Sequence, residues 1–415
     1  MSKSLKQAAL DYHENPQPGK ISVEIIKSAE TAKDLSLAYS PGVAVPVREI
    51  AKDPNTAYRY TGKGNLVAVI SNGSAILGLG NLGALASKPV MEGKALLFKR
   101  FAAINAIDIE VDCDDPQRFI DIVKRISPSF GGINLEDIKA PECFEIEQAL
   151  IEACDIPVFH DDQHGTSIVS VAGILNALEI TGKSISDVRL VCMGAGAAAI
   201  SCCWLLLELG LKRENLYVLD SRGVIHEQRT NLNRYKASVA AKTSMRTLDD
   251  VIENADIFLG LAGPDLLTAE QLQKMATNPV VFACSNPDPE INPDLAKKTR
   301  SDVIMATGRS DYPNQVNNVL GFPFIFRGAL DVRAAVINDA MKIAAVHAIK
   351  DLAKEPVTQA IRDAYEGRDF SFGTDYILPK PMDSRLLSIV SAAVARAAVD
   401  SGVAKLDYPA HYPLV

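Results

Sequence analysis

The chain has 415 residues, and its 43 Lys and Arg against 51 Asp and Glu give a formal charge of −8. Hydrophobic residues make up 47 % of it and charged residues 23 %, values of a globular protein that exclude the disordered and fibrous classes. The acidic balance, with no run of Lys or Arg, argues against nucleic-acid binding, because neutralising phosphates needs clustered cations. The length predicts two or three domains.

Seven cysteines form no C-x-x-C pair, which disfavours a zinc knuckle and a disulfide framework and favours reduced thiols in the cytoplasm. The N-terminus lacks the apolar segment of a secretory signal. Residues 190–207 carry no formal charge and are long enough to suggest a membrane span. Their glycines fit a buried strand, a turn and a buried helix better, so we expect no membrane partner.

Short apolar runs rich in Val and Ile alternate with longer helical patterns along the whole chain. Such continuous runs predict parallel strands covered by helices on both faces, so the expected fold class is α/β with two parallel-sheet domains. The expected strands are residues 66–71, 104–111, 156–160, 188–193, 216–220, 257–262, 280–284 and 303–307, and an amphipathic helix is expected at 337–353. A domain boundary is expected near residue 160.

Residues 78–83 match the dinucleotide-binding pattern G-x-G-x-x-G, but their surroundings oppose that function. The preceding Asn72-Gly73 pair is typical of a hairpin turn. Pro89 is expected to break a helix that begins after Gly83. We therefore interpret this segment as a tight structural loop beside the site.

Two pairs of acids follow apolar runs, Glu136-Asp137 and Asp161-Asp162. Ligands bind at the carboxyl ends of parallel strands, and carboxylates clustered there are costly unless a cation neutralises them. Oxygen ligands favour Mg²⁺ or Mn²⁺, and helix caps or solvated turns are the alternative. His160 and His164 have the spacing of a zinc-binding helix, but a strand end and a glycine beside them favour orienting roles.

A second glycine turn follows an apolar strand and opens an uninterrupted helical run, after which another strand ends at Asp220. Its residues are Gly194, Ala195, Gly196, Ala197, Ala198 and Ala199. This order predicts a dinucleotide-binding unit in which the glycines admit a pyrophosphate to the helix N-terminus, and a plain βαβ crossover is the alternative. Asp220 favours the ribose of NAD, whereas Ser221-Arg222 favours the 2′-phosphate of NADP.

The chain resembles the malic enzymes, specifically the malic-enzyme portion of the bacterial hybrid type, over nearly its whole length. The motifs that carry the resemblance are LAYSPGVA (37–44), ILGLGNLG (76–83), MEGKALLFK (91–99), NLEDI (134–138), FHDDQHGT (159–166), GAGAAA (194–199), SNPDPE (285–290) and residues 308–331. It implies an N-terminal substrate and metal domain (1–160), a Rossmann-type NAD(P)-binding domain (161–317) and C-terminal helices (318–415) that pack back on the first domain. It also implies a homodimer or a higher homo-oligomer.

The resemblance assigns roles to individual residues. Tyr39 matches the general acid of the family, Lys94 its general base, which also contacts substrate, and Asp161 an acid beside the reacting hydroxyl. The implied metal ligands are Glu136, Asp137 and Asp162, and the amides on the substrate and nicotinamide sides are Asn286, Asn317 and Asn318. Ala75 stands where larger eukaryotic-type members have an arginine, so the partner of the substrate carboxylate stays unassigned. The turn 220–223 resembles that of NADP-preferring members.

The implied activity is oxidative decarboxylation of L-malate to pyruvate and CO₂, with NADP or NAD as oxidant and Mg²⁺ or Mn²⁺ as metal. For Lys94 to act as a base near neutral pH, burial or neighbouring cations must lower its pKa. A malolactic reaction that yields lactate uses nearly the same residues. A non-catalytic, nucleotide-sensing regulator is the alternative from another class. Hybrid members of the family continue into a phosphotransacetylase-like domain that senses acetyl-CoA.

Overall fold

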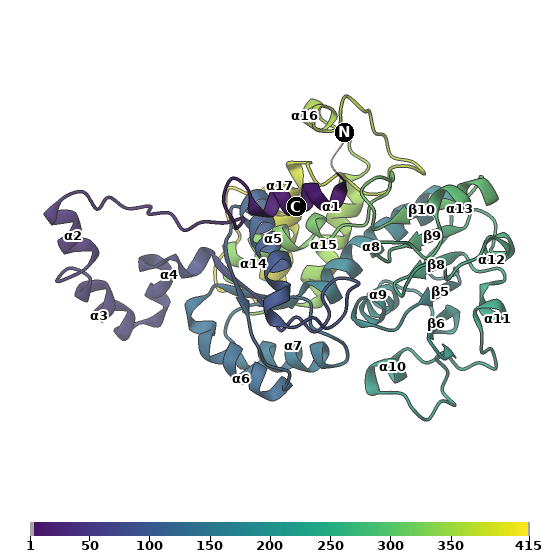
Figure 1. The fold of residues 1–415 in the computed structure, drawn as a ribbon, viewed down its shortest axis with the longest axis horizontal. Coiled ribbons are helices and arrows are strands. Elements are labelled where there is room, and N and C mark those ends of the chain that lie inside the picture. Colours follow the sequence, from purple (N-terminus) through teal and green to yellow (C-terminus); the bar gives the residue numbers. More distant parts are fainter. Residues whose placement is uncertain (1–3, 414–415) are drawn as a thin grey trace.

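The computed structural model describes residues 4–413 and contains two separate sheets, each flanked by helices (Figure 1). One sheet has the strand order β2-β1-β3-β4, and the other has the order β10-β9-β8-β5-β6-β7. All neighbouring strands are parallel except β7, which runs antiparallel to β6. The expected α/β class with two parallel sheets is confirmed.

The four-stranded sheet lies in the N-terminal part of the chain. Its strands are β1 (Leu66–Ser71), β2 (Asn105–Glu110), β3 (Gly132–Leu135) and β4 (Val158–His160), and its helices are α5 (Ala84–Ala102), α6 (Pro116–Ile126), η3 (Ser127–Ser129) and α7 (Glu142–Ala153). Strand β3 is absent from the expected strands. Its four residues include a glycine and an asparagine, which are weak strand formers, yet it pairs with β1 and β4 in the middle of the sheet.

The six-stranded sheet contains every expected strand after residue 160. Its strands are β5 (Leu190–Met193), β6 (Leu216–Asp220), β7 (Gly223–Val224), β8 (Ile257–Gly260), β9 (Val280–Ala283) and β10 (Ile304–Thr307). The helices of this part are α8 (Asp161–Thr181), α9 (Ala197–Glu208), η4 (Arg213–Asn215), α10 (Arg234–Ser238), α11 (Leu248–Ile252), α12 (Ala269–Lys274) and α13 (Pro293–Thr299). The uncharged stretch 190–207 is thus a strand, a turn and a helix. Among residues 4–413 no helix is long and apolar enough to cross a membrane.

The C-terminal part is helical and packs on the N-terminal sheet. Its helices are η5 (Asn318–Leu320), α14 (Phe322–Asp331), α15 (Asp339–Leu352), α16 (Gln359–Ala364) and α17 (Arg385–Asp400). Phe98 of α5 lies between two rings of α14, with centroid distances of 4.8 Å to Phe322 and 5.2 Å to Phe326. Such buried edge-to-face contacts hold α14 against α5. The exact limits of the three proposed segments stay a prediction.

Helix α5 corrects two expectations. It continues through Pro89, although a proline was expected to break it, and the loss of one backbone hydrogen bond is offset because the following turns bury Met91, Ala95 and Phe98. Asn72-Gly73 forms no hairpin, since both neighbours of β1 are parallel to it. The uninterrupted α5 carries Lys94 on its buried face.

An extended segment, residues 21–61, projects from the rest of the molecule, and we call it the arm (Figure 1). The helices at this end of the chain are α1 (Leu5–Glu14), which precedes the arm, then α2 (Ala32–Ala38), α3 (Ala44–Lys52), η1 (Pro54–Thr56), α4 (Ala57–Tyr60) and η2 (Gly62–Asn65). The helix α3 packs on η1, and α4 packs on η1 and η2. No residue in the range 21–61 is buried.

Candidate functional site

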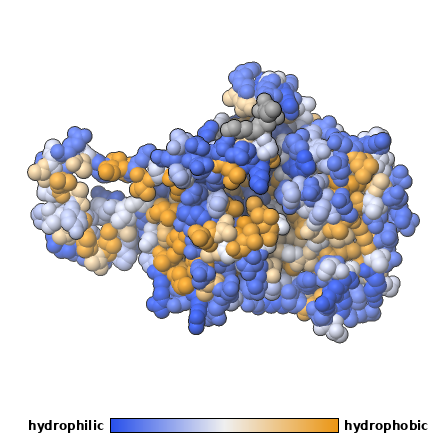
Figure 2. Space-filling model, viewed as in Figure 1, coloured by the Kyte–Doolittle hydropathy of each residue, from blue (hydrophilic) through white to orange (hydrophobic). Residues whose placement is uncertain are grey.

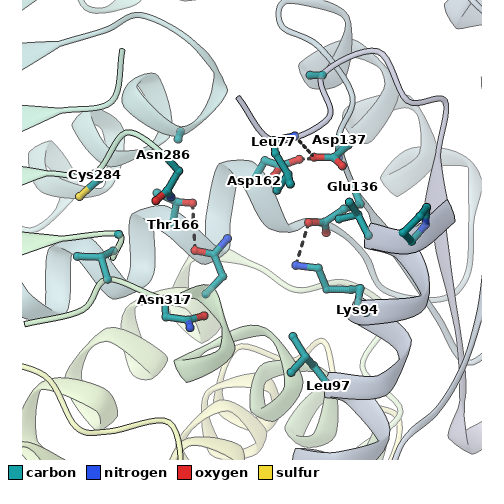
Figure 3. Close-up of a pocket in the computed structure, with 18 of the residues that line it drawn as sticks. Leu77, Lys94, Leu97, Glu136, Asp137, Asp162, Thr166, Cys284, Asn286 and Asn317 are labelled. Carbon is teal, nitrogen blue, oxygen red and sulfur yellow. Dashed lines mark hydrogen bonds and ion pairs between the residues drawn. The ribbon is translucent and has the colours of Figure 1, made fainter. Parts of the chain in front are cut away.

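A cavity of about 740 Å³ lies between the two sheets and is lined by α5, by the loops after β1 and β3, by the first turns of α8 and α9 and by loops of the second sheet. Figure 3 shows Lys94, Glu136, Asp137 and Asp162 on one side and Asn286 and Asn317 on the other. The structure therefore brings together residues that are far apart in the sequence.

The three acids proposed as metal ligands form one group, which we call the carboxylate cluster. Glu136 and Asp137 follow β3, and Asp162 lies in the first turn of α8 directly after β4, the neighbouring parallel strand. One carboxylate oxygen from each lies within 4.8 Å of the others. Within residues 4–413, Asp137 Oδ2 is buried and has no hydrogen-bond partner. This oxygen is available to a cation.

The electrostatics of the carboxylate cluster also suit a cation. Burial, together with the charge of Asp162, raises the pKa of Asp137 to about 7. Burial also raises the pKa of Glu136 well above its usual range, although Lys94 acts in the opposite direction. Negative charge is therefore costly here until a positive ion compensates it. Because every donor is an oxygen, the group fits Mg²⁺ or Mn²⁺ better than zinc.

Lys94 is held by two carboxylates. Its Nζ lies 2.6 Å from Asp161 Oδ2 and 2.8 Å from Glu136 Oε1. Burial acts to lower the pKa of Lys94, but the two carboxylates outweigh it, so the pKa is raised above its ordinary value. The lowered pKa that a base near neutral pH requires is therefore not found here, because acids and not cations surround the amine.

Amide side chains continue this network across the cavity. Asn318 Nδ2 donates to Asp161 Oδ2 at 3.1 Å, and its Oδ1 accepts a hydrogen bond from Thr166 at 3.1 Å. Asn134 of β3 donates to Glu136 Oε2 at 2.9 Å. Thr166 and Asn134 were not predicted, although a polar residue inside a buried strand is a signal that points to Asn134. Tyr12, His13 and Lys20 of the N-terminal segment also line the cavity, without any motif to mark them.

The loop after β1 has the structural role expected of residues 78–83. Ala75 N donates to the carbonyl of Asp137 at 2.9 Å, and Leu77 N donates to Asp137 Oδ1 at 3.3 Å. Asp137 and Leu77 have φ angles of +52° and +46°, a strained region for side chains of this kind. A Cβ on Gly78 would lie 2.6 Å from the carbonyl oxygen of Asn286. The loop thus sets the position of Asp137.

The two histidines are occupied elsewhere. His160 Nδ1 accepts the backbone N–H of Gln163 at 3.3 Å and caps α8. His164 Nε2 lies 3.0 Å from Glu147 Oε2, a carboxylate whose pKa is lowered to about 2 because His164, Lys342 and His160 outweigh its burial. Glu147 also accepts the backbone N–H of His160 at 2.8 Å. Both histidines therefore orient the start of α8, as the spacing argument favoured.

The second glycine turn leads into α9 as expected of a dinucleotide site. Gly194 has a φ of +123°, and a Cβ there would lie 2.6 Å from the carbonyl oxygen of Leu261. The helix begins at Ala197 with Gly196 as its N-cap, and Ala198 lines the cavity. The unpaired N–H groups and the positive end of α9 are available to a phosphate group.

Alanine substitutions at Gly194 and Gly196 test which glycine the folded backbone of the turn requires. We expect Gly194→Ala to lower the free energy of unfolding by about 1–3 kcal/mol, because the new Cβ meets backbone and the φ angle is strained. Gly196→Ala is the matched control, since its Cβ has no neighbour within 4 Å among the described residues. Denaturant unfolding without NADP measures both, and an equal loss of stability in the two variants would contradict this interpretation.

Asp220 is paired within the protein at the end of β6. Its two oxygens accept hydrogen bonds from both terminal nitrogens of Arg229 at 2.9 and 3.0 Å, and Oδ2 also accepts one from Lys236 at 2.7 Å. Arg222 N donates to Oδ1 at 3.0 Å. Burial acts to raise the pKa of Asp220, but Arg229 and Lys236 outweigh it and hold the pKa below its usual range. Hydroxyl groups of a ribose would therefore have to compete with Arg229, Lys236 and the backbone N–H of Arg222 for the oxygens of Asp220.

Tyr39 is the one proposed catalytic residue that this single chain does not bring to the cavity. It follows α2 on the arm, its side chain is 77 % exposed, and it is not among the described residues that line the cavity. A general acid is expected to lie beside the substrate in the cavity, whereas Tyr39 is exposed on the arm. The motif around Tyr39 contains no information on which part of the fold it faces.

Comparisons with known proteins agree with this geometry. Residues 18–151 match the family model of the malic enzyme N-terminal domain, and residues 163–362 match that of the malic enzyme NAD binding domain. The NADP-dependent malic enzyme of Halomonas elongata is 70 % identical over 414 residues, which are 100 % of this chain and 98 % of that protein. The NADP-dependent malic enzyme of Escherichia coli is 61 % identical over 97 % of this chain, which spans only 54 % of that longer protein.

A solved structure gives the same result for the fold. The malic enzyme from Pyrococcus horikoshii Ot3 superimposes with a TM-score of 0.88 at 45 % identity, covering 97 % of this chain and 93 % of that one. Both family models together match well over half of the residues. The chain belongs to the malic enzyme family.

Proposed function

We propose that this protein oxidatively decarboxylates L-malate to pyruvate and CO₂, with NADP as the oxidant and Mg²⁺ or Mn²⁺ as the metal. The observation that carries the proposal is the meeting of three features in one cavity. The carboxylate cluster, the Lys94–Asp161–Asn318 network and the first turn of α9, which follows the second glycine turn, all line or border the cavity. A four-carbon hydroxy acid in that cavity would contact all three.

The chain's own residues supply binding and proton transfer. A divalent cation held by the carboxylate cluster would lower the pKa of Lys94, and the neutral amine, positioned by Asp161 and Glu136, would then accept the proton of the malate C2 hydroxyl. The amides of Asn286, Asn317 and Asn318 face the same space and orient the carboxylates of the substrate and the nicotinamide. NADP held at the glycine turn would supply the hydride acceptor, and a divalent ion held by Glu136, Asp137 and Asp162 would supply positive charge that favours loss of CO₂. The family resemblance assigns the return of a proton to C3 to Tyr39, which in this structure lies on the exposed arm and not at the cavity.

The paired Asp220 supports NADP over NAD. The side chains of Arg229 and Lys236 both contact Asp220 at the end of β6, so two positive charges meet one carboxylate there, and Arg222 follows two residues later with its backbone N–H on Oδ1. Such a group suits the 2′-phosphate of NADP, and it leaves Asp220 little capacity to accept hydrogen bonds from the ribose of NAD.

Arg229→Ser should shift this preference. We expect kcat/KM for NADP to fall about 10–100-fold, since a hydrogen bond to a charged group contributes roughly 1.5–3 kcal/mol. Values for NAD should fall less or rise, because Asp220 is released from its bidentate partner. Steady-state rates with each nucleotide measure the ratio. Arg213→Ser, an exposed arginine of the same domain, is the control, and an unchanged NADP-to-NAD ratio in Arg229→Ser would count against the assignment.

The activity itself is tested by absorbance of reduced nicotinamide with malate and Mn²⁺, once with NADP and once with NAD. Pyruvate as the product would support oxidative decarboxylation, whereas lactate without net reduction of the nucleotide would establish the malolactic reaction. NADP binding in a calorimeter without turnover of malate would leave a nucleotide-sensing regulator.

A cytoplasmic location also belongs to the proposal. All seven cysteines lie in the described part of the chain and are free thiols, six of them buried. Buried free thiols of this kind are typical of proteins from reducing compartments.

A further inference from the structure

Malate carries two carboxylates, and the cavity must supply positive charge to hold them. A divalent ion at the carboxylate cluster brings two positive charges to the three acids that bind it, Glu136, Asp137 and Asp162, so it leaves little charge for the substrate. Lys94 is already paired with Asp161 at 2.6 Å and with Glu136 at 2.8 Å. A further cation is therefore needed for a substrate carboxylate.

Lys20 is the one other Lys or Arg side chain that lines the cavity among residues 4–413. It follows α1, and its Nζ donates to the carbonyl of Pro89 on α5 at 2.7 Å. Pro89 and Gly93 both line the cavity from α5, the helix that also carries Lys94. This hydrogen bond thus holds the ammonium group of Lys20 at the same wall of the cavity.

The charge of Lys20 is not claimed by the acids nearest to it, because another lysine binds them. Lys88 Nζ lies 2.5 Å from Asp108 and 3.8 Å from Glu92. These two carboxylates attract Lys20 as well, but burial outweighs them and lowers its pKa. In the described part of the chain Lys20 forms one hydrogen bond and no ion pair, so two of its three N–H groups remain available.

The wall beside Lys20 is mostly apolar. Val90, Leu96 and Leu97 of α5 also line the cavity. Figure 2 shows hydrophobic residues on both sides of the hollow between the N-terminal part and the second sheet. A carboxylate against such a surface is costly unless a cation pairs with it. A negatively charged substrate that lies along α5 therefore gains most from contact with Lys20.

We propose that Lys20 binds the C1 carboxylate of malate, the one that is retained in pyruvate. The C4 carboxylate leaves as neutral CO₂, so an ion pair with C4 would stabilise bound malate more than the transition state and would slow the reaction. An ion pair with C1 lasts through the whole turnover. This inference rests on the proposed function and adds a substrate-binding residue to it.

Lys20→Gln tests the ion pair, because glutamine keeps an N–H donor for the carbonyl of Pro89 and removes the charge. We expect KM for malate to rise about 10–100-fold, the effect of losing a hydrogen bond between charged groups. The value of kcat should stay nearly unchanged, since bound malate and the transition state share the contact with C1. KM for NADP should equal that of the wild type.

Lys6→Gln, at an exposed lysine of α1 that does not line the cavity, is the matched control and should keep every wild-type constant. Lys20→Arg restores the positive charge and should keep KM for malate close to that of the wild type. An unchanged KM for malate in Lys20→Gln would overturn the proposal, and so would a loss confined to kcat. Equal losses in Lys20→Gln and Lys20→Arg would also overturn it, because charge would then not be the property that matters.

Pyruvate identifies which carboxylate Lys20 binds. It keeps C1 and lacks C4, so as a product inhibitor it should bind Lys20→Gln about 10–100-fold more weakly, in parallel with malate. Inhibition by pyruvate that equals the wild type, together with a raised KM for malate, would place Lys20 at C4 and overturn the assignment to C1.

The outcomes separate this inference from the proposed function. A wild-type protein that turns over no malate contradicts the function itself. A wild type that turns over malate, with the constants for malate and pyruvate unchanged in Lys20→Gln, contradicts only the role of Lys20.

Discussion

Lys94→Ala is expected to lower turnover of malate by about 10²–10⁴-fold, the contribution typical of one proton-transfer group. Among residues 4–413, Lys94 is the side-chain amine that contacts both Asp161 and the carboxylate cluster, so its loss removes the group that would accept the hydroxyl proton once it is neutral. NADP affinity should change little, because the glycine turn and the cations around Asp220 belong to the other sheet.

Stopped-flow absorbance of NADPH and titration of NADP binding test the two halves of this expectation. Lys99→Ala, on the exposed side of the same helix, is the control. Thermal unfolding must accompany the rates, since removing Lys94 leaves the buried Asp161 and Glu136 without their counter-charge. Unchanged turnover in a folded Lys94→Ala protein would remove Lys94 from the mechanism.

Asp162→Ala is expected to raise the concentration of Mn²⁺ needed for half-maximal activity by more than tenfold. Loss of a group that only supports a metal ligand typically costs about 10–100-fold in metal affinity, and loss of a ligand should cost at least as much. Asp162 also accepts the backbone N–H of Asp137 at 2.7 Å, so its removal loosens a second ligand.

Calorimetric titration with Mn²⁺ provides a measure that does not depend on activity. Asp162→Asn keeps an acceptor for the N–H of Asp137 while it removes the charge, and so separates the two contributions. Glu152→Gln, an exposed carboxylate of α7, is the control. Equal Mn²⁺ affinity in Asp162→Ala and the wild type would show that Asp162 is no ligand.

Long apolar runs predicted most of the fold, because parallel strands covered on both faces leave a continuous signal. Strand β3 escaped because its position depends on pairing with β1 and β4, a tertiary contact that outweighs the weak strand preference of its residues. Helix α5 continues through Pro89 for a similar reason. Burial of Phe98 and its neighbours stabilises the helix, and this burial exists only in the assembled core.

The sequence predicted those residues of the candidate site that come directly after an apolar strand. Two acid pairs were predicted to lie near a cation because each follows an apolar run, and the family resemblance selected Glu136, Asp137 and Asp162. The structure groups these three because they follow β3 and β4, which are adjacent and parallel. The raised pKa of Lys94 could not be predicted, since Asp161 is distant in the sequence but only 2.6 Å away in space. Arg229 and Lys236 likewise approach Asp220 only through the fold. The place of Tyr39 on the exposed arm could not be predicted either, because the motif around it does not show which part of the fold it faces.

Helix α8 has a mechanical consequence. It begins at Asp161 and Asp162, and farther along it packs closely on α9, the helix that starts at the dinucleotide turn. A helix of 21 residues is stiff over its length, so tilting it displaces both of its ends together. Binding of a metal at one end of α8 and positioning of the nucleotide beside α9 are therefore coupled. A side chain added at Gly173, where a Cβ would lie 3.0 Å from the ring of Phe282, should weaken both metal binding and nucleotide binding.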